Sequence, residues 1–590
     1  MKYDLIQRFN NVLKVYFKFA FWINLLGLFF IIYDFGFNQS YFTQNIINQF
    51  FYFVVGFGII ATILRYFQKE KRLTLKVISF DLVSISISIF IIYHQLNTTS
   101  IIHQALFFHK INWVEFAVFL TLIRELAEQK INYKRISFNP AQLFIISFII
   151  IILLCTLLLL LPNSTVYGIN FLDALFTATS AVCVTGLAVV DTSSEFTTLG
   201  QIILVIFIQI GGLGILTFAS YFSYFFKGST SYGNQLVMSD MSNAEKIGEV
   251  FSTFKRVLTI TFIVELFGAI LLYFSTNEKL FESKFQHYFF SMFHSISAFC
   301  NAGFSTLSNS IVETGFTTNY FLQLSIITLF VLGGLGFPIV LNLLSYLKHL
   351  ILKYLLMRKK YSHKARIINL NSKITLITTF SLIGLGTLFY FILEYNNTLQ
   401  NHSTFFGKII TALFQATTPR TAGFNAVDMG QLHTGTILLT IFLMWIGASP
   451  SSTGGGIKTS TFAIATLNFL SLAKGKNKLE LSRREIPDTS IRRAFAIITL
   501  SFIVVGIATF TIALFNPELS LLKITFECFS AYSTTGLSLG ITNSLHPLSK
   551  FVLILTMFTG RVTMLTVLIA FMKKVNYRNY KYPTEDILIN

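Results

Sequence analysis

ATSAVCVTGLAV (Ala178–Val189) is a short, mostly small-residue stretch between two long apolar runs, and three similar stretches follow it along the chain. They are SISAFCNAGFST (Ser295–Thr306), ATTPRTAGFNAV (Ala416–Val427) and SAYSTTGLSLGI (Ser530–Ile541). Each contains one glycine followed by Leu or Phe, and these glycines, Gly186, Gly303, Gly423 and Gly536, are 117, 120 and 113 residues apart. Self-similarity at so regular a spacing indicates an internal repeat.

The composition places these repeats in a membrane. The chain has 590 residues, of which 53% are hydrophobic and only 12% charged, and its mean hydropathy is +0.66. Runs such as Ala141–Leu161, Gln201–Phe226 and Ala494–Phe515 reach the roughly 20 apolar residues that span about 30 Å of hydrocarbon. The sequence therefore predicts an all-α polytopic membrane protein.

Each glycine stretch lies between two candidate spans. The first spans are expected at about 141–161, 256–274, 376–394 and 494–514, and the second at about 199–224, 318–345, 432–472 and 547–572. Before the glycines come stretches such as FLDALFTATSA (Phe171–Ala181) and KITFECFSAYS (Lys523–Ser533), which are long enough for half a membrane and too short for a whole one. The predicted unit is helix, short re-entrant helix, glycine turn, helix, in four repeats: 141–245, 246–365, 366–485 and 486–575.

Residues 1–140 form a predicted N-terminal membrane extension with four spans, at about 12–36, 50–67, 75–94 and 112–127. Four helices before a pore invite comparison with a voltage sensor, and Asp81 fits the third helix of one. A sensing helix needs a basic residue at every third position, and only Arg124 lies at depth. A packing or assembly role is the favoured alternative.

The net charge of +19 follows topology rather than nucleic-acid binding. Lysines and arginines gather in short segments between apolar runs, as the positive-inside rule expects. These segments are Arg65–Lys76, Arg124–Arg135, Lys227–Arg256, Lys348–Lys373 and Lys474–Arg493. With eight core spans after four N-terminal ones, all five segments are cytoplasmic, as are the N-terminus and the tail 576–590, and every glycine turn opens to the outside.

The glycine turns suggest ion chemistry. Irregular backbone at membrane depth is tolerated where it lines an aqueous cavity, and a backbone that aims carbonyls at an axis needs conformations that glycine adopts cheaply. Rings of such carbonyls replace the hydration shell of an alkali cation. One glycine per repeat predicts a shorter filter, and looser selectivity, than two would. Taken singly, each could be an ordinary glycine at a helix junction, so the fourfold repetition carries the inference.

These stretches resemble the filter sequences of the Trk/Ktr/HKT superfamily of potassium transporters, and of its Ktr-type membrane subunits most closely, over about residues 141–575. The resemblance implies a central pore whose potassium filter consists of Val184, Thr185, Gly186, Leu187, Asn301, Ala302, Gly303, Phe304, Thr421, Ala422, Gly423, Phe424, Thr534, Thr535, Gly536 and Leu537. Sodium-favouring plant members have Ser at the first filter position. Gly186 therefore implies potassium as the main ion, with sodium as a candidate coupled or activating ion.

A second motif, IGASPSSTGGGIKTSTF (Ile446–Phe462), interrupts the second helix of repeat three. The resemblance implies an intramembrane loop that closes the pore, with Ser451, Ser452, Gly454, Gly455, Gly456, Lys458 and Arg561 as gate residues. Arg561 lies about 18 Å deep if its helix enters near Ser549; the alternative is an arginine that reaches the inner headgroups, and Lys458 could equally be a loop-end cation. Glycines at Gly211–Gly214 and Gly333–Gly336 are interpreted as close helix packing.

The remaining expectations concern function as a whole. Asp191, Glu195 and Asp428 follow the filters and would concentrate cations or merely solubilise the surface, while Asp173 and Glu527 are expected to hold loops. The chain has no HExxH, GxGD, Walker A or GxGxxG motif, so no enzyme activity and no organic cofactor are expected. The resemblance implies a homodimer in the cell membrane, surrounded by lipid and controlled by a cytosolic nucleotide-binding ring of RCK/KTN type. A sodium/potassium symporter or a sodium-permeable uniporter is the alternative function.

Overall fold

The computed structural model describes residues 2–67, 75–96, 112–128, 140–225, 250–355 and 368–572. Most of the predicted basic segment Lys227–Arg256, much of Lys348–Lys373 and the whole tail 576–590 lie outside these residues. The chain forms two compact units. The first contains residues 1–136 and 161–164, and the second contains residues 137–160 and 165–590.

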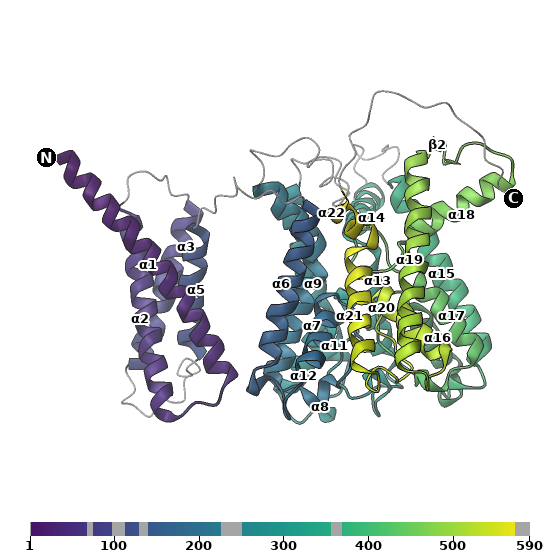
Figure 1. The fold of residues 1–590 in the computed structure, drawn as a ribbon, viewed down its shortest axis with the longest axis horizontal. Helices are drawn as coiled ribbons and strands as arrows, with labels where there is room; N and C mark the ends of the chain where they lie inside the picture. Colours follow the sequence, from purple (N-terminus) through teal and green to yellow (C-terminus); the bar gives the residue numbers. More distant parts are fainter. Residues whose placement is uncertain are drawn as a thin grey trace. The chain divides into compact units, whose positions relative to one another are not determined.

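The first unit is helical and contains two buried ion pairs. Its helices are α1 (Lys2–Gly36), α2 (Tyr41–Arg65), α3 (Leu75–Leu96) and α5 (Asn112–Glu128), drawn in purple in Figure 1. Arg124 of α5 meets Asp81 of α3 at 2.6 Å, and Arg65 of α2 meets Glu125 of α5 at 2.6 Å; all four side chains are buried. Removing one partner of a buried ion pair leaves an uncompensated charge and is strongly destabilising, so these contacts favour a packing role for the predicted N-terminal extension.

The second unit contains the four predicted helix–turn–helix segments in order. The first helices are α6 (Pro140–Leu159), α11 (Val250–Ser275), α15 (Leu370–Glu394) and α19 (Asp488–Phe515). The short helices are α7 (Phe171–Val182), α12 (Lys284–Cys300), α16 (Phe405–Thr417) and α20 (Leu521–Ser533). The second helices are α9 (Thr198–Phe225), α13 (Tyr320–Leu335) with α14 (Phe337–Leu350), α17 (Thr434–Trp445) with α18 (Thr459–Ala473), and α21 (Pro547–Val562) with α22 (Met564–Phe571).

Short connecting elements complete the second unit. They are α8 (Thr192–Glu195), the 3-10 turns η4 (Glu278–Leu280), η5 (Ser310–Val312), η8 (Thr398–Asn401) and η9 (Met429–Gln431), the π turn η6 (Ile351–Leu355), and a hairpin of β1 (Glu480–Leu481) and β2 (Arg484–Glu485). The 3-10 turn η2 (Pro162–Ser164) belongs to the first unit. Figure 1 shows α6, α19 and α21 running along a common direction, with α18 lying across it.

Three of the second helices are broken, whereas the sequence predicted a break in repeat three alone. α13 and α14 meet at 107°, and α21 and α22 meet at 87°. The joints are Gly336 (φ +83°) and Thr563 (φ +69°), which leave the right-handed helical region. The interpretation of Gly333–Gly336 as helix packing was therefore incomplete, because its last glycine ends a helix.

The membrane character follows from helix length and composition. Among the described residues, six helices are long and apolar enough to cross a membrane, or eight if each bent pair is one span. In the first unit, α1 and α2 meet this criterion over Asn11–Gly36 and Tyr41–Arg65, whereas the apolar part of α3 is the shorter Val77–Tyr93. Helix α5 carries buried Glu115, Arg124 and Glu125, which lower its hydropathy.

The core clusters of the second unit extend from one repeat into the next. One cluster joins Val184 of repeat one to Phe304 of repeat two, and another joins Phe330 of repeat two to Phe424 of repeat three. A third joins repeats three and four, and a fourth joins Phe176 of repeat one to the α20–α21 region of repeat four. Because neighbouring repeats bury apolar side chains against each other, the four repeats close into a ring.

Candidate functional site

The four predicted filter glycines meet one another at the centre of this ring. Their φ angles are +91° at Gly186, +70° at Gly303, +81° at Gly423 and +89° at Gly536, a region that favours glycine. A Cβ on Gly186 would collide with the carbonyl oxygen of Ala302, and one on Gly303 with Ala422 and Gly423. Continuing round, Gly423 lies against Thr535, and Gly536 against Thr185. Each glycine therefore lies against the filter segment of the next repeat, in chain order.

A second left-handed residue precedes each glycine by two positions and was not expected from the sequence. These residues are Val184 (φ +57°), Asn301 (+61°), Thr421 (+70°) and Thr534 (+51°). Non-glycine residues in this region cost about 1–3 kcal/mol each and persist where the surrounding structure enforces them. Two left-handed positions in each segment turn the chain sharply after each short helix, which brings the glycines together.

Side-chain hydroxyls of the short helices hold this strained backbone in two ways. In repeats one and four, Ser180 and Ser530 accept hydrogen bonds from the glycine N–H groups of Gly186 (3.0 Å) and Gly536 (3.1 Å). In repeats two and three, Ser297 and Thr418 instead donate to the carbonyls of Phe304 and Phe424, the first at 2.7 Å. The Ser/Thr-rich entry of each motif thus has a structural task, and the four filter segments form two unlike pairs.

All four predicted filter glycines line one pocket of about 390 Å³. Asp191 also lines it, whereas Glu195 and Asp428 are not among its lining residues. Asp191 accepts a hydrogen bond from the Ser193 N–H (3.0 Å), and Asp428 accepts one from the Gly430 N–H (2.9 Å). Of the three acidic residues, Asp191 alone therefore combines a loop-capping contact with a position at the pocket.

The two acidic residues of the short helices hold the surrounding structure. Glu527 is buried and accepts hydrogen bonds from the hydroxyls of Ser538 and Thr542 and the N–H of Leu539. This is the expected loop-holding contact. Asp173 differs, because it forms an ion pair of 2.8 Å with Lys550 of α21 and so ties the short helix of repeat one to a second helix of repeat four.

The glycine-rich segment 446–458 between α17 and α18 forms a loop directly against the filter. The Thr453 hydroxyl donates to the Asn301 side-chain oxygen (3.0 Å), and the Gly455 N–H donates to the Thr534 hydroxyl (2.9 Å). Gly454 lies so close to Thr421 that a Cβ would collide with its hydroxyl. The loop therefore contacts the left-handed residues of repeats two, three and four.

The same loop is fastened to the break between α13 and α14. The Ser449 N–H donates to the Gly334 carbonyl (3.0 Å), and the Phe337 N–H donates to the Ser451 carbonyl (3.3 Å). A Cβ on Gly336 would lie 2.6 Å from the Pro450 carbonyl oxygen. Repeat two thus holds the loop of repeat three through backbone N–H and carbonyl groups at the α13–α14 break. The spacing of the sequence repeats does not predict this contact.

Arg561 and Lys458 both bind the loop's backbone. Arg561 is 2% exposed, and its guanidinium donates to the carbonyls of Thr453 and Gly211. Lys458 donates from its ammonium to the Gly454 carbonyl (2.6 Å). The structure therefore brings both predicted cations to the loop. The remaining predicted gate residues, Ser451, Ser452, Gly454, Gly455 and Gly456, belong to the loop itself.

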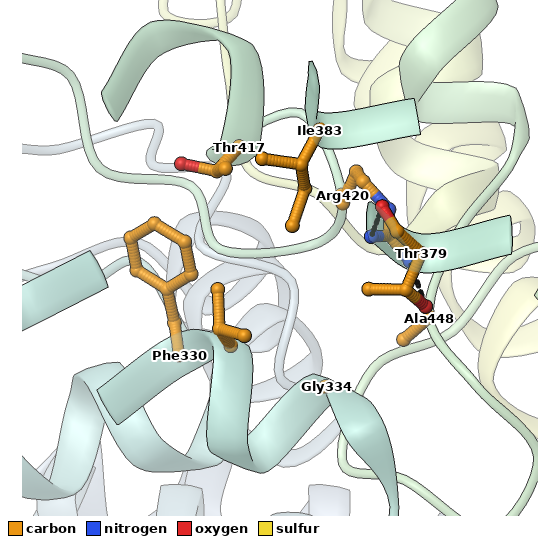
Figure 2. A pocket seen from close by; sticks show the side chains of 8 residues that line it. Phe330, Gly334, Thr379, Ile383, Thr417, Arg420 and Ala448 are labelled. Carbon is orange, nitrogen blue, oxygen red and sulfur yellow. Dashed lines mark hydrogen bonds between the residues drawn. The ribbon is translucent and has the colours of Figure 1, made fainter. Parts of the chain in front are cut away.

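Arg420, two residues before Ala422 in repeat three, is a buried cation that the motif analysis overlooked. It lies at a cavity of about 20 Å³, room for one water molecule, with Phe330 and Thr417 also on its wall (Figure 2). Its guanidinium donates to the carbonyl (3.4 Å) and hydroxyl (3.5 Å) of Thr379, and no carboxylate is among the eight lining residues. The signal was present in TTPRTAG, since a charge in a motif of small residues is unusual.

Glycines on the second helices allow close approach to the short helices. A Cβ on Gly211, Gly333 or Gly560 would collide with the carbonyl of Val182, Phe299 or Tyr532, respectively. Each of these carbonyls belongs to the residue four positions before a filter glycine. The expected close packing holds at Gly211 and Gly333, and it extends to Gly560, which the sequence interpretation did not include.

These features define a polytopic all-helical membrane protein with short helices that end at a common glycine ring. Residues 109–581 match the family described as TrkH, cation transport protein. The chain therefore belongs to the TrkH cation transport protein family, which comprises transporters and not enzymes, and the predicted superfamily is confirmed. The match begins at residue 109, so it includes α5 of the first unit.

Several relatives match nearly over their own full length. The chain is 35% identical over 467 residues to the potassium/sodium uptake protein NtpJ of Enterococcus hirae, covering 77% of this chain and 98% of NtpJ. It is 34% identical to the Ktr system potassium uptake protein B of Bacillus subtilis, covering 77% and 97%. The potassium transporter TrkH from Vibrio parahaemolyticus has a similar fold, with a TM-score of 0.58 at 16% identity and coverage of 84% and 98%.

Proposed function

We propose that this protein mediates gated uptake of potassium across the plasma membrane. The observation that carries the proposal is the closed ring of Gly186, Gly303, Gly423 and Gly536, which lie against one another's filter segments and share one pocket. The filter would consist of these glycines and their predicted neighbours in each repeat. Two similar proteins, of Enterococcus hirae and Bacillus subtilis, carry potassium uptake in their names.

The electrostatics of the ring favour a cation. Helices α7, α12, α16 and α20 end at Val182, Cys300, Thr417 and Ser533, one to four residues before the filter segments begin. The C-terminal end of a helix carries partial negative charge, and backbone carbonyls can replace a cation's hydration shell. One glycine per repeat gives a short filter, for which we expect looser selectivity than a longer filter has.

The loop 446–458 would act as the gate. It lies against three of the four filter segments and is held by Arg561, Lys458 and the α13–α14 break. The hydrogen bonds that hold the loop to the filter segments can break without unfolding a span, because each contributes about 1 kcal/mol net. The fixed charge of Arg561 would in addition repel a cation below the filter.

The proposed topology follows the basic segments. It has eight core spans in the four repeats 141–245, 246–365, 366–485 and 486–575, preceded by four spans within 1–140. Both termini, including the tail 576–590, would be cytoplasmic, and the filter pocket would face outward. The cytoplasmic segments around Lys348 and Lys474 would meet a nucleotide-binding regulatory ring, and the membrane subunit would be a homodimer.

A sodium/potassium symporter or a sodium-permeable uniporter is the second candidate. The name of the Enterococcus hirae relative includes both ions, and a short filter discriminates less between them. Measurement of rubidium uptake with and without a sodium gradient separates the candidates.

Uptake of rubidium by vesicles containing the purified chain tests the proposal directly. We expect rubidium uptake that excess potassium inhibits. A Gly186→Ser variant should take up ions with altered selectivity. Absence of uptake with and without a cytosolic partner would overturn the transport proposal, and uptake that depends on sodium would favour the symporter.

A further inference from the structure

Two hollows lie at the start of α15, near Pro450 and Ser451 of the loop 446–458. The first, of about 720 Å³, is lined by the opening turn of α15, the hairpin and the loop tip, and its polar residues include Asn369, Asn371 and Ser482. The second, of about 470 Å³, follows α15 and α18 and is lined mainly by apolar side chains. Both include Lys373 and Ser482, so the two hollows adjoin, and we treat them as the polar half and the apolar half of one feature.

The polar half carries positive charge only. Its charged lining residues are Lys373 and Arg484. The opening turn of α15 adds the partial positive charge of a helix N-terminus, and the N-cap residue Asn369 makes no side-chain capping bond there. The nearby carboxylate of Glu485 is engaged by Lys478 at 2.9 Å, and this hydrogen bond raises the pKa of the Lys478 ammonium. An anionic group is therefore the complementary ligand.

The hairpin fixes both halves relative to each other. Ser482 and Arg483 have φ angles of +51° and +63°, as in the tight two-residue turns that match strand twist. The turn pairs Leu481 directly with Arg484, and residues paired across strands point to the same face. Leu481 lines the apolar half and Arg484 the polar half, while Glu480 and Glu485 form the other pair.

The apolar half has the character of a membrane-exposed groove. It runs along successive turns of α15 from Ile374 to Leu385, and Phe462 of α18 forms part of its other wall. Ile377 and Leu385 are 58% and 55% exposed, on a helix that qualifies as a membrane span. A groove at membrane depth that leads to a basic pocket fits an acyl chain attached to an anionic headgroup.

We infer that this feature binds a phospholipid with an anionic headgroup, its phosphate between Lys373 and Arg484 and an acyl chain along α15. The site is distinct from the filter, and it rests on the proposed topology only for its assignment to the inner leaflet. Pro450 and Ser451 also line the polar half. Because Ser451 is fastened to Phe337, the headgroup would touch the proposed gate at its tip.

Fluorescence quenching of Trp445 provides a local test. The chain has three tryptophans, and the Trp445 ring lies 6.5 Å from that of Phe462 in the groove wall. The full chain with Trp22→Phe and Trp113→Phe is reconstituted in neutral phosphatidylcholine containing a small fraction of lipid with brominated chains. We expect brominated phosphatidylglycerol to quench Trp445 at a roughly 10- to 30-fold lower mole fraction than brominated phosphatidylcholine, since each basic residue favours an anionic lipid.

Variants identify the ligand. Lys373→Gln with Arg484→Gln should remove the preference for phosphatidylglycerol, whereas the matched pair Lys348→Gln with Lys474→Gln should keep it. Ser381→Phe, which fills the groove, should reduce quenching while uptake persists. Equal quenching by both lipids would overturn the inference.

Two further outcomes would assign the feature to another occupant. Soluble glycerol phosphate could compete with brominated phosphatidylglycerol and reduce its quenching of Trp445. If this competition is the same in Ser381→Phe, the pocket binds a free phosphate compound, and the lipid assignment is overturned. A change in dimer fraction with unchanged quenching in Ser381→Phe would show a subunit interface and overturn it too. Rubidium uptake by the same vesicles reports separately on the proposed function, because loss of uptake with an intact lipid preference contradicts only transport.

Discussion

Arg561 of α21 donates a hydrogen bond to the backbone carbonyl of Thr453, a residue 108 positions earlier in the chain. Its second terminal nitrogen donates to the carbonyl of Gly211 in repeat one. The side chain is buried, so the loop, repeat one and repeat four share a single charged group. A buried arginine bound only to carbonyls retains its positive charge close to the proposed path of the ion.

Replacement of Arg561 by Gln should loosen the loop and remove that charge. We expect rubidium uptake to rise roughly 3- to 10-fold, because the loop loses its bond and a cation–cation repulsion disappears. Lys550→Gln is the matched control, because Lys550 lies on the same helix as Arg561 and its replacement breaks the ion pair with Asp173 of α7 without touching the loop. Equal effects of both variants on uptake would show that Arg561 acts through general packing.

Gly186→Ser tests the filter. The left-handed backbone and the collision of a Cβ with the Ala302 carbonyl should distort the ring, so discrimination against sodium should fall in a competition flux assay. Gly168→Ser is the control, because Gly168 has a similar φ of +83° but no atom near its Cβ position. It carries a comparable backbone cost of about 1–2 kcal/mol away from the ring. Unchanged selectivity in Gly186→Ser would contradict the filter assignment.

Deletion of Ser451–Gly456 removes the residues of the loop that contact Asn301, Thr421 and Thr534. We expect a folded variant with higher potassium flux, measured by rubidium uptake in vesicles and accompanied by a melting curve to confirm folding. A folded variant with unchanged flux would exclude the loop as the gate.

The contact between loop and helix break can be tested by a neighbouring pair of glycines. Gly336→Ala places a Cβ 2.6 Å from the Pro450 carbonyl at a left-handed residue, whereas Gly334→Ala places one no closer than 3.5 Å to any atom. Gly336→Ala should therefore displace the loop tip and raise uptake, and Gly334→Ala should leave it near the original rate. The reverse order would contradict the role of the break.

Packing of second helices on short helices predicts a stability difference. Gly560→Ala should destabilise the protein by about 1–3 kcal/mol, as overpacking typically does, because its Cβ meets the Tyr532 backbone. Gly506→Ala in α19, where no atom lies within 4 Å, should be neutral or stabilising by up to about 1 kcal/mol. Thermal unfolding in detergent measures both, and an equal shift would argue against tight packing at Gly560.

Local chemistry in the sequence was sufficient for the elements of the fold. Apolar runs of span length, the short helices before each glycine and the interruption at Gly454 are all visible along the chain, and the helices appear where these signals lie. The helix break at Gly336 was not predicted, because the sequence GGLG is equally compatible with close helix packing. The break at Thr563 was not predicted, because threonine is an ordinary residue in an apolar helix. Arg420 was overlooked although its charge is plain in the motif.

The sequence by itself therefore determined that this is a membrane protein of four helix–turn–helix repeats with a glycine at each turn, because hydrophobicity and repeat spacing are properties of the chain. Only the tertiary structure decided that each glycine meets the next repeat's backbone, that Ser and Thr hydroxyls hold the four segments in two different ways, and that Arg561 and the α13–α14 break secure one loop. The hydroxyl contacts span six or seven residues, whereas the others join residues more than 100 positions apart. The geometry of these long-range contacts depends on how whole repeats pack around an axis, which no local pattern encodes.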